Sequence, residues 1–206
     1  SLGTNGSNFP AGSDTVVTIT IKRLVASVSE SWDDYVLRTP SATFFHRAGW
    51  QTVLKQAFGH DTHFIYAEQD GRIVGVLPLA QVRSALFGNS LSSLPFCVYG
   101  GIVADSQQIA DSLRLEACRL AEELKVGALE LRNIAHSDTK WPVKELYFTF
   151  RKAIDASDDV NLKAIPNRQR AMVRKGMDEG LGSEWDEGTD RLYRVYAESV
   201  RNLGTP

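Results

Sequence analysis

Positive charge gathers in one stretch of the chain, residues 161–181. Its basic side chains fall within thirteen positions that contain no acid: Lys163, Arg168, Arg170, Arg174 and Lys175. Groups of this kind bind phosphate, RNA or carboxylate, and contacts to phosphate position a ligand without reading a sequence. The alternative interpretation is the solvated face of an ordinary helix. Both interpretations require an amphipathic helix over residues 161–181, with Pro166 in its first turn and Gly180 at its C-terminal end.

Two further groups of residues stand where predicted strands are interrupted or end. Tyr99, Gly100 and Gly101 interrupt one strand, where glycines either form a bulge or let backbone N–H groups approach a carboxylate or diphosphate. Arg132 and Asn133 end another strand. There the guanidinium either meets an anionic substrate or forms a surface ion pair. Both groups are therefore candidate substrate-binding residues.

Other reactive side chains are scattered along the sequence. Cys97 and Cys118 form neither a disulfide framework nor a metal-ligand motif, and the four histidines form no metal-binding cluster. No Ser/His/Asp or Cys/His arrangement stands out, so we assign no catalytic residue and no general base. His46 and Trp50 are weaker candidates for a cleft, because both residues also suit a core.

The composition is that of a globular protein. The 206 residues are 43% hydrophobic and 23% charged, with a net charge of −2, so a nucleic-acid contact would have to come from a local patch. The length suits one full domain and part of another. No apolar run approaches the roughly 18 residues that span a bilayer, and no leader precedes the first strand. We therefore expect a cytoplasmic protein, with residues 1–14 as a flexible tail.

The expected elements that must position these residues form a mixed α/β sheet. A helix beginning at Ser31, a helix over residues 50–58 and a helix capped by Asp105 accompany the strands. Asp70 and Gly71 predict a tight hairpin turn. A loop over residues 84–90 and a final helix after residue 190 complete the chain. Strands are expected over residues 15–24, 62–69, 72–82, 91–104, 127–133 and 146–153, with a short extended piece over 182–185.

This order of elements resembles the GNAT acyltransferase fold. Residues 163–176, K-A-I-P-N-R-Q-R-A-M-V-R-K-G, and the later helix RLYRVYAESVRNLGTP resemble FemAB-type proteins. The segments ATFFHRAGW, DGRIVGVLPLA, LPFCVYGG and ALELRN are similar to the FemAB-like subgroup associated with PEP-CTERM and exosortase systems. The resemblance implies an α/β (α+β) fold with a mixed, largely antiparallel sheet. It assigns residues 15–155 to a GNAT-like domain and residues 156–206 to the first helices of a truncated second GNAT-like domain.

The same resemblance implies an acyltransferase or aminoacyltransferase. It would move an acyl group directly to an amine of a cell-envelope or exopolysaccharide-related precursor, in a cleft between two GNAT-like domains. Tyr99, Gly100 and Gly101 would lie in the acceptor cleft, and Arg201 and Asn202 would line the cleft between domains. The basic residues of 161–181 would contact phosphate or tRNA. The expected acceptor is an anionic small molecule or a lipid-linked precursor.

The expected donor is aminoacyl-tRNA, ahead of acyl-CoA, and no covalently bound cofactor is expected. The sequence VYGGIVADSQQ stands where coenzyme A-dependent GNAT enzymes carry a pyrophosphate-binding R/Q-x-x-G-x-G/A loop. Two alternatives stay open: a CoA-dependent N-acyltransferase of the same fold, and a non-enzymatic module that binds anions or RNA through residues 161–181. Truncation further predicts inactivity of the fragment alone and self-association through an apolar surface.

Overall fold

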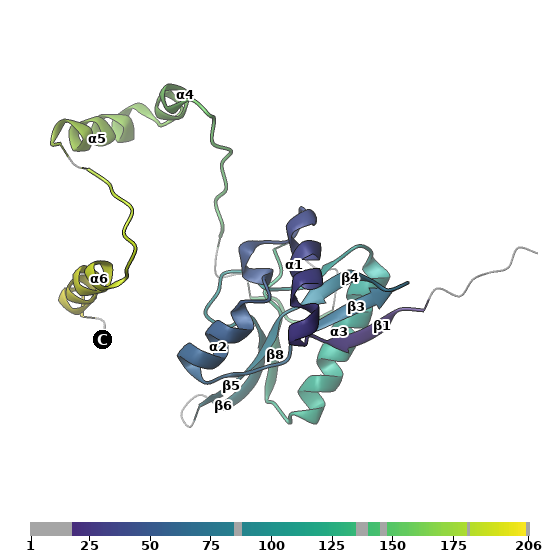
Figure 1. Cartoon of the computed structure of the whole chain (residues 1–206). Helices are drawn as coiled ribbons and strands as arrows, with labels where there is room; N and C mark the ends of the chain where they lie inside the picture. Colours follow the sequence, from purple (N-terminus) through teal and green to yellow (C-terminus); the bar gives the residue numbers. More distant parts are fainter. Residues whose placement is uncertain (1–17, 85–87, 135–139, 145–147, 181, 205–206) are drawn as a thin grey trace, which may run out of the picture. The chain divides into compact units, whose positions relative to one another are not determined.

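The computed structural model describes residues 18–84, 88–134, 140–144, 148–180 and 182–204 (Figure 1). The chain divides into two units, residues 1–141 and 142–206. Both β-sheets belong to the first unit, and the described part of the second unit contains helices but no strand. The tail expected over residues 1–14 lies outside the described residues. The domain boundaries inferred from the sequence stay predictions.

The first sheet is antiparallel throughout, with the strand order β1-β3-β4-β7. The predicted hairpin between β3 and β4 is confirmed, and its turn residues Asp70 and Gly71 have φ values of +51° and +74°. These positive values are those of a type I′ turn, which matches the twist of the strands beside it. The strands of this sheet are β1 (Thr20–Arg23), β3 (Ile65–Gln69), β4 (Arg72–Leu77) and β7 (Val103–Ala104).

The second sheet has the order β2-β5-β6-β8, and its β6–β8 pair is parallel. Its strands are β2 (Asp61–Thr62), β5 (Leu79–Ser84), β6 (Gly88–Ser93) and β8 (Ala128–Glu130). The single strand predicted over residues 72–82 was wrong, because the chain passes from the first sheet to the second at Pro78. Proline has no N–H to donate to a ladder, so the strand is interrupted there.

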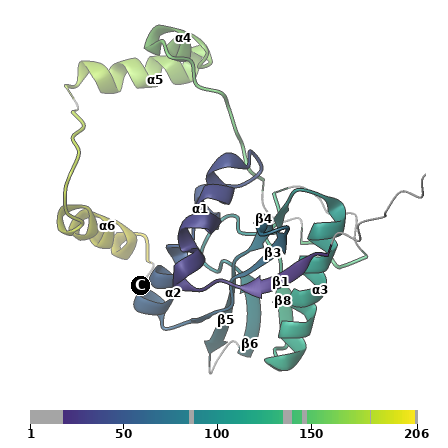
Figure 2. The same cartoon turned by 45° about the vertical axis from the view of Figure 1, so that its right-hand side comes forward.

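Two helices cover opposite faces of the first sheet (Figure 2). Alternate residues of β3 and β4 face opposite sides, and each side has its own buried cluster. Tyr66 and Val76 pack in the cluster of α1 (Ser29–Arg38), with its Trp32, Tyr35 and Val36. Ile65, Ala67 and Leu77 pack in the cluster of α3 (Gln107–Glu123), with its Ile109, Leu113, Ala117 and Leu120. The expected mixed α/β fold is confirmed.

Helix α2 (Trp50–Phe58) is less buried, since among its residues Leu54 alone is fully enclosed. It follows a short 3₁₀ turn, Phe44–His46, and ends at Gly59 in the left-handed conformation, as its sequence predicts. The strand predicted over residues 91–104 is broken between Ser93 and Val103. Its middle forms an irregular loop. Of the loop predicted over residues 84–90, residues 85–87 lie outside the described part and the flanking residues belong to strands.

The second unit contains α4 (Asp158–Lys163), α5 (Asn167–Asp178) and α6 (Asp190–Asn202). The continuous helix predicted over residues 161–181 was wrong. Pro166 is the N-cap of α5, with ψ 145°, because its ring cannot continue α4. No strand forms over the described residues 148–153 or 182–185. None of the described residues after 141 is buried, and no described helix is long and apolar enough to cross a membrane.

Candidate active site

The candidate residues of the first unit meet at one irregular loop, residues 94–101, which we call the site loop. It leaves β6 after Ser93 and returns toward β7. Leu94 and Phe96 adopt φ values of +50° and +68°. Residues other than glycine rarely adopt this backbone conformation, and each instance costs on the order of 1–3 kcal/mol. The loop therefore needs strong anchors.

The first anchor is Leu94, whose side chain is fully buried. Its N–H donates to the Pro78 carbonyl at 3.1 Å, and the Cys97 N–H donates to the Leu94 carbonyl at 3.3 Å. Cys97 is also buried, and burial raises the pKa of its thiol. A buried thiol of this kind is a poor nucleophile.

Arg132 is the second anchor. Its backbone N–H donates to Oγ of buried Ser93 at 2.7 Å, and its Nη1 donates to the Cys97 carbonyl at 2.7 Å. Its Nε donates to Oε1 of Glu130 at 2.9 Å. The guanidinium is thus part of the structure that holds the loop. The sequence could not identify the serine or the carbonyl as its partners, because 39 and 35 residues separate them from Arg132.

Gly100 and Gly101 let the chain approach itself. A Cβ on Gly101 would lie 2.2 Å from Oδ1 of Asn133, and one on Gly100 would lie 2.5 Å from Cβ of Leu94. The Gly101 N–H donates to the Arg132 carbonyl at 3.0 Å, and Asn133 Oδ1 accepts from the Ile102 N–H at 3.1 Å. Close packing thus accounts for both glycines, and substrate binding at this point stays a prediction.

His46 holds the site loop from the other side. Its ring is 1% exposed; Nδ1 accepts from the Thr43 N–H at 3.0 Å, so Nε2 carries the proton and donates to the Gly101 carbonyl at 3.1 Å. Burial lowers the pKa of His46, which keeps the ring neutral. Because both nitrogens are engaged, His46 is a positioning residue and not a general base. Thr43 and His46 form a capping box, and their three-residue spacing is the sequence signal that indicates this local role of His46.

Several backbone donors of the site loop are unused. Among the described residues, the N–H groups of Phe96, Val98 and Gly100 have no hydrogen-bond partner. Gly100 is buried, and a buried N–H without a partner is unfavourable unless a ligand or water accepts from it. Backbone N–H groups that lie close together in an irregular loop bind anions. Tyr99 lies between Val98 and Gly100 and contacts Phe45 at a ring distance of 6.3 Å.

Trp50 lies beside these aromatic rings. It is partly buried, its Nε1 donates to the Phe44 carbonyl at 3.2 Å, and its ring contacts Phe44 and Phe45. These contacts show that Trp50 packs against the 3₁₀ turn before α2.

The N-terminus of α3 is already capped. Ser106, and not the predicted Asp105, is the N-cap, and its Oγ accepts from the Ile109 N–H at 3.3 Å. Asp105 Oδ1 instead accepts from the Tyr35 hydroxyl at 2.9 Å, and burial followed by this contact raises the pKa of Tyr35. A pyrophosphate at this helix end would meet the Asp105 carboxylate, which opposes binding.

The remaining candidates belong to the second unit. Arg170 Nη2 donates to the carbonyls of Lys163 and Ile165 at 2.7 and 2.8 Å, so this guanidinium caps the C-terminal end of α4. The other basic residues of this stretch, and the two polar residues at the end of α6, are exposed: Lys163, Arg168, Arg174, Lys175, Arg201 and Asn202. Their expected contact with phosphate or tRNA stays a prediction.

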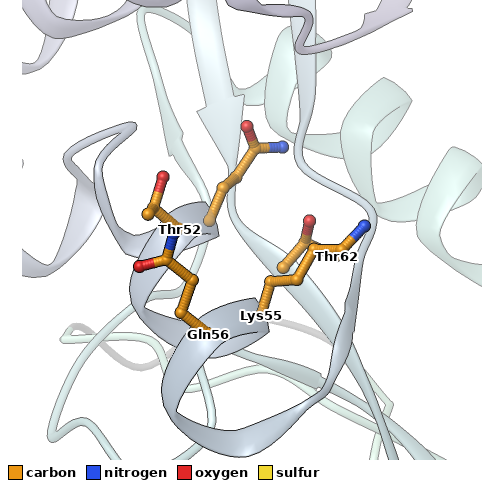
Figure 3. Close-up of a pocket in the computed structure, with 5 residues that line it drawn as sticks. Thr52, Lys55, Gln56 and Thr62 are labelled. Carbon is orange, nitrogen blue, oxygen red and sulfur yellow. The ribbon is translucent and has the colours of Figure 1, made fainter.

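Two hollows lie beside α2. One, of about 240 Å³, is lined by Gln51, Thr52, Lys55, Gln56 and Thr62 (Figure 3). The other, of about 330 Å³, shares Gln51 and Thr52 with it and extends to Glu30 and Asp33 of α1. The described residues contain no group of three metal-binding side chains.

No family model matches this chain, and no curated protein matches its sequence. Solved structures with a similar course of the chain have low sequence identity. A GNAT family acetyltransferase from Staphylococcus aureus is 15% identical, with a TM-score of 0.38, over 62% of this chain and 98% of that one. A transcriptional regulator from Bacillus halodurans is 13% identical, with a TM-score of 0.42, over 66% and 100%. A ribosomal-protein-alanine N-acetyltransferase from Brucella melitensis is 15% identical, with a TM-score of 0.40, over 64% and 100%. Similarities at this level carry no information on substrate.

Proposed function

We propose that this protein is an acyltransferase or aminoacyltransferase that moves its acyl group directly to an amine. The observation that supports it best is the pair of unused N–H groups, Val98 and Gly100, in a loop fixed by Arg132 and His46. When an amine attacks an ester or thioester, negative charge develops on the carbonyl oxygen. Fixed N–H donors stabilise that charge without reorganising during the reaction.

The chemistry requires no covalent enzyme intermediate. The buried Cys97 thiol is unsuited to nucleophilic catalysis, and the His46 ring, whose two nitrogens are both hydrogen-bonded, is unsuited to base catalysis. Positioning of donor and acceptor would supply much of the rate, as in other direct transfers. The acceptor we propose is the amine of an anionic, lipid-linked or cell-envelope precursor, in line with the FemAB-like resemblance.

Aminoacyl-tRNA is the donor we favour over acyl-CoA. The Asp105 carboxylate stands before α3, where the pyrophosphate of coenzyme A would need positive charge or free N–H groups. A second candidate function is binding of RNA or another anion without catalysis. It is favoured by the exposed Arg168, Arg174 and Lys175 of α5.

A transfer assay tests the proposal. The protein, together with any residues encoded beyond Pro206, is incubated with labelled aminoacyl-tRNA or acyl-CoA and an amine-bearing peptidoglycan precursor, and amide product is detected by mass spectrometry. We expect an amide from aminoacyl-tRNA and a loss of kcat/KM of about a hundredfold in Arg132→Ala, because the loop is displaced. Arg119→Ala, at an exposed ion-paired position of α3, serves as the matched control. Folded protein that forms no amide with either donor would contradict the proposal, and salt-sensitive RNA binding alone would favour the second candidate.

A further inference from the structure

Three nearly parallel rings form an exposed platform beside the site loop. Phe96 stacks on Phe58 at a centroid distance of 4.4 Å and an angle of 22°, and on His60 at 5.5 Å and 12°. Phe58 and His60 are 6.1 Å apart at 11°. We call Phe58, His60 and Phe96 the ring platform. Phe96 is 60% exposed and Phe58 is 48% exposed, so the rings offer a flat surface to solvent.

Local structure fixes this platform firmly. Gly59, with φ +69°, ends α2 and turns the chain, and the N–H groups of Gly59 and His60 donate to carbonyls of the last helical turn. Phe96 is held at φ +68° between buried Leu94 and Cys97, whose carbonyl accepts from Arg132. An unfavourable backbone conformation is therefore maintained at a residue whose ring stays largely outside the core. Such conformations concentrate at binding sites.

A cation and polar groups lie next to the platform. Lys55 precedes Phe58 by one helical turn, so both project from neighbouring parts of α2. It forms no ion pair with a described residue, and it lines the 240 Å³ hollow together with Thr52, Gln56 and Thr62 (Figure 3). Asp61, the acid beside His60, is paired with Arg83. The surroundings thus combine flat rings, a free ammonium group, hydroxyls and amides.

We propose that the ring platform and the Lys55 hollow bind an adenosine phosphate, with the base on Phe96 and the phosphate at Lys55. Stacking on aromatic side chains suits the large face of a purine, and hydroxyl and amide groups suit a ribose. This inference rests on the proposed function, because both candidate donors carry adenosine: aminoacyl-tRNA at its 3′ end and acyl-CoA in its nucleotide. It assigns the donor to the side of the site loop that faces α2.

Binding of adenosine monophosphate to the whole chain tests the inference. The ring resonances of His60 are followed by NMR during titration with adenosine monophosphate or with ribose 5-phosphate. We expect saturable shifts of His60 with adenosine monophosphate and at least tenfold weaker binding of ribose 5-phosphate, which has no base. Equal binding of the two probes would overturn the proposal, since stacking would then contribute nothing.

Two variants separate the platform from a folding defect. Phe96→Gly removes the ring while accepting φ +68° without steric cost, so its thermal unfolding should stay cooperative. We expect at least tenfold weaker binding of adenosine monophosphate, with recovery in Phe96→Trp. Phe44→Ala removes a different exposed ring, which is 71% exposed, and should change the affinity less than twofold. Unchanged affinity in Phe96→Gly would overturn the proposal.

Coenzyme A and a short RNA ending in 3′-adenosine then distinguish the two sources. Tighter binding of the RNA assigns the platform to aminoacyl-tRNA, and tighter binding of coenzyme A assigns it to acyl-CoA. Displacement of adenosine monophosphate by neither would overturn the assignment to a donor. The transfer assay is interpreted separately. Amide formation that Phe96→Gly leaves unchanged would contradict only the assignment of the ring platform to the donor. Binding of adenosine monophosphate at the platform without amide formation would contradict only the proposed function.

Discussion

Arg132 fixes the geometry of the candidate site through three groups that differ in chemistry. Its backbone N–H donates to the Ser93 hydroxyl, its Nη1 donates to the Cys97 carbonyl, and its Nε donates to the Glu130 carboxylate. His46 adds a fourth contact at Gly101. These contacts hold the site loop in a conformation that Leu94 and Phe96 would not adopt alone. The unused N–H groups of Val98 and Gly100 are therefore fixed in space before any ligand arrives.

Gly101→Ala is expected to destabilise the protein. Its Cβ would lie 2.2 Å from Oδ1 and 2.8 Å from N of Asn133, so the site loop and the segment after β8 must separate. Overpacking of this kind costs about 1–3 kcal/mol of the free energy of unfolding. Urea unfolding measures the change. Gly127→Ala is the matched control, since its Cβ meets only the Asn89 carbonyl at 3.6 Å; equal loss in both variants would contradict the packing at Gly101.

Stability should fall on mild acidification. Burial lowers the pKa of His63 below 6.5, and the Arg23 guanidinium lowers it further; burial also lowers the pKa of His46. Just below pH 6.5 the unfolded chain therefore binds protons that the folded chain does not. The free energy of unfolding then rises with pH up to about 6.5 and levels off above it. Urea unfolding across this range measures the slope.

His63→Leu isolates one contribution to that slope. Neither ring nitrogen of His63 has a hydrogen-bond partner among the described residues, so leucine removes the titrating group without removing a bond. We expect a shallower dependence of the free energy of unfolding on pH. An unchanged slope would mean that His63 does not contribute to the pH dependence.

At the level of elements, the sequence predicts regular structure better than its interruptions. The hairpin, the helix stop at Gly59 and the apolar stripe of α3 follow from local periodicity and turn residues, and all are confirmed. The sheet change at Pro78 and the exit of the chain from β6 depend on distant contacts. The same holds for the site: residue types singled out Gly100, Gly101, Arg132 and Asn133, whereas Ser93 and the Cys97 carbonyl became visible only in the fold.

Arg170→Ala should loosen the corner between α4 and α5. Its guanidinium donates to the carbonyls of Lys163, the last residue of α4, and of Ile165 just beyond it. Charged hydrogen bonds are worth about 1.5–3 kcal/mol when buried, and less at a partly exposed site such as this one. Amide hydrogen exchange of α4 should become several-fold faster. Arg168→Ala, an exposed neighbour, should leave exchange unchanged; equal effects would show that charge and not capping is responsible.

At the scale of the whole molecule, the buried side chains of the described residues are confined to one unit. Both buried clusters belong to residues 1–141, and none of the described residues of 142–206 is buried. Limited chymotrypsin digestion should therefore cut first at exposed aromatic residues such as Phe150 and Trp185. We expect a resistant fragment that retains the first unit. Initial cleavage within α1 or α3 would contradict this division.

Self-association is a second property expected of the whole chain. The second unit exposes large apolar side chains, among them Phe148, Phe150, Trp185, Tyr193 and Tyr196. Apolar surface of this extent favours contacts between copies. Sedimentation velocity should show an average mass that rises with protein concentration. A constant monomer mass over a wide concentration range would contradict the expectation.

The most direct test of the site is an NMR titration of the backbone amides with a small anion such as acetate or pyrophosphate. We expect the largest saturable shifts at Val98 and Gly100, and we expect Arg132→Ala to abolish them while leaving the rest of the first unit folded. Shifts confined to the basic residues of α5, or none in the site loop, would contradict the claim that this loop binds the reacting group.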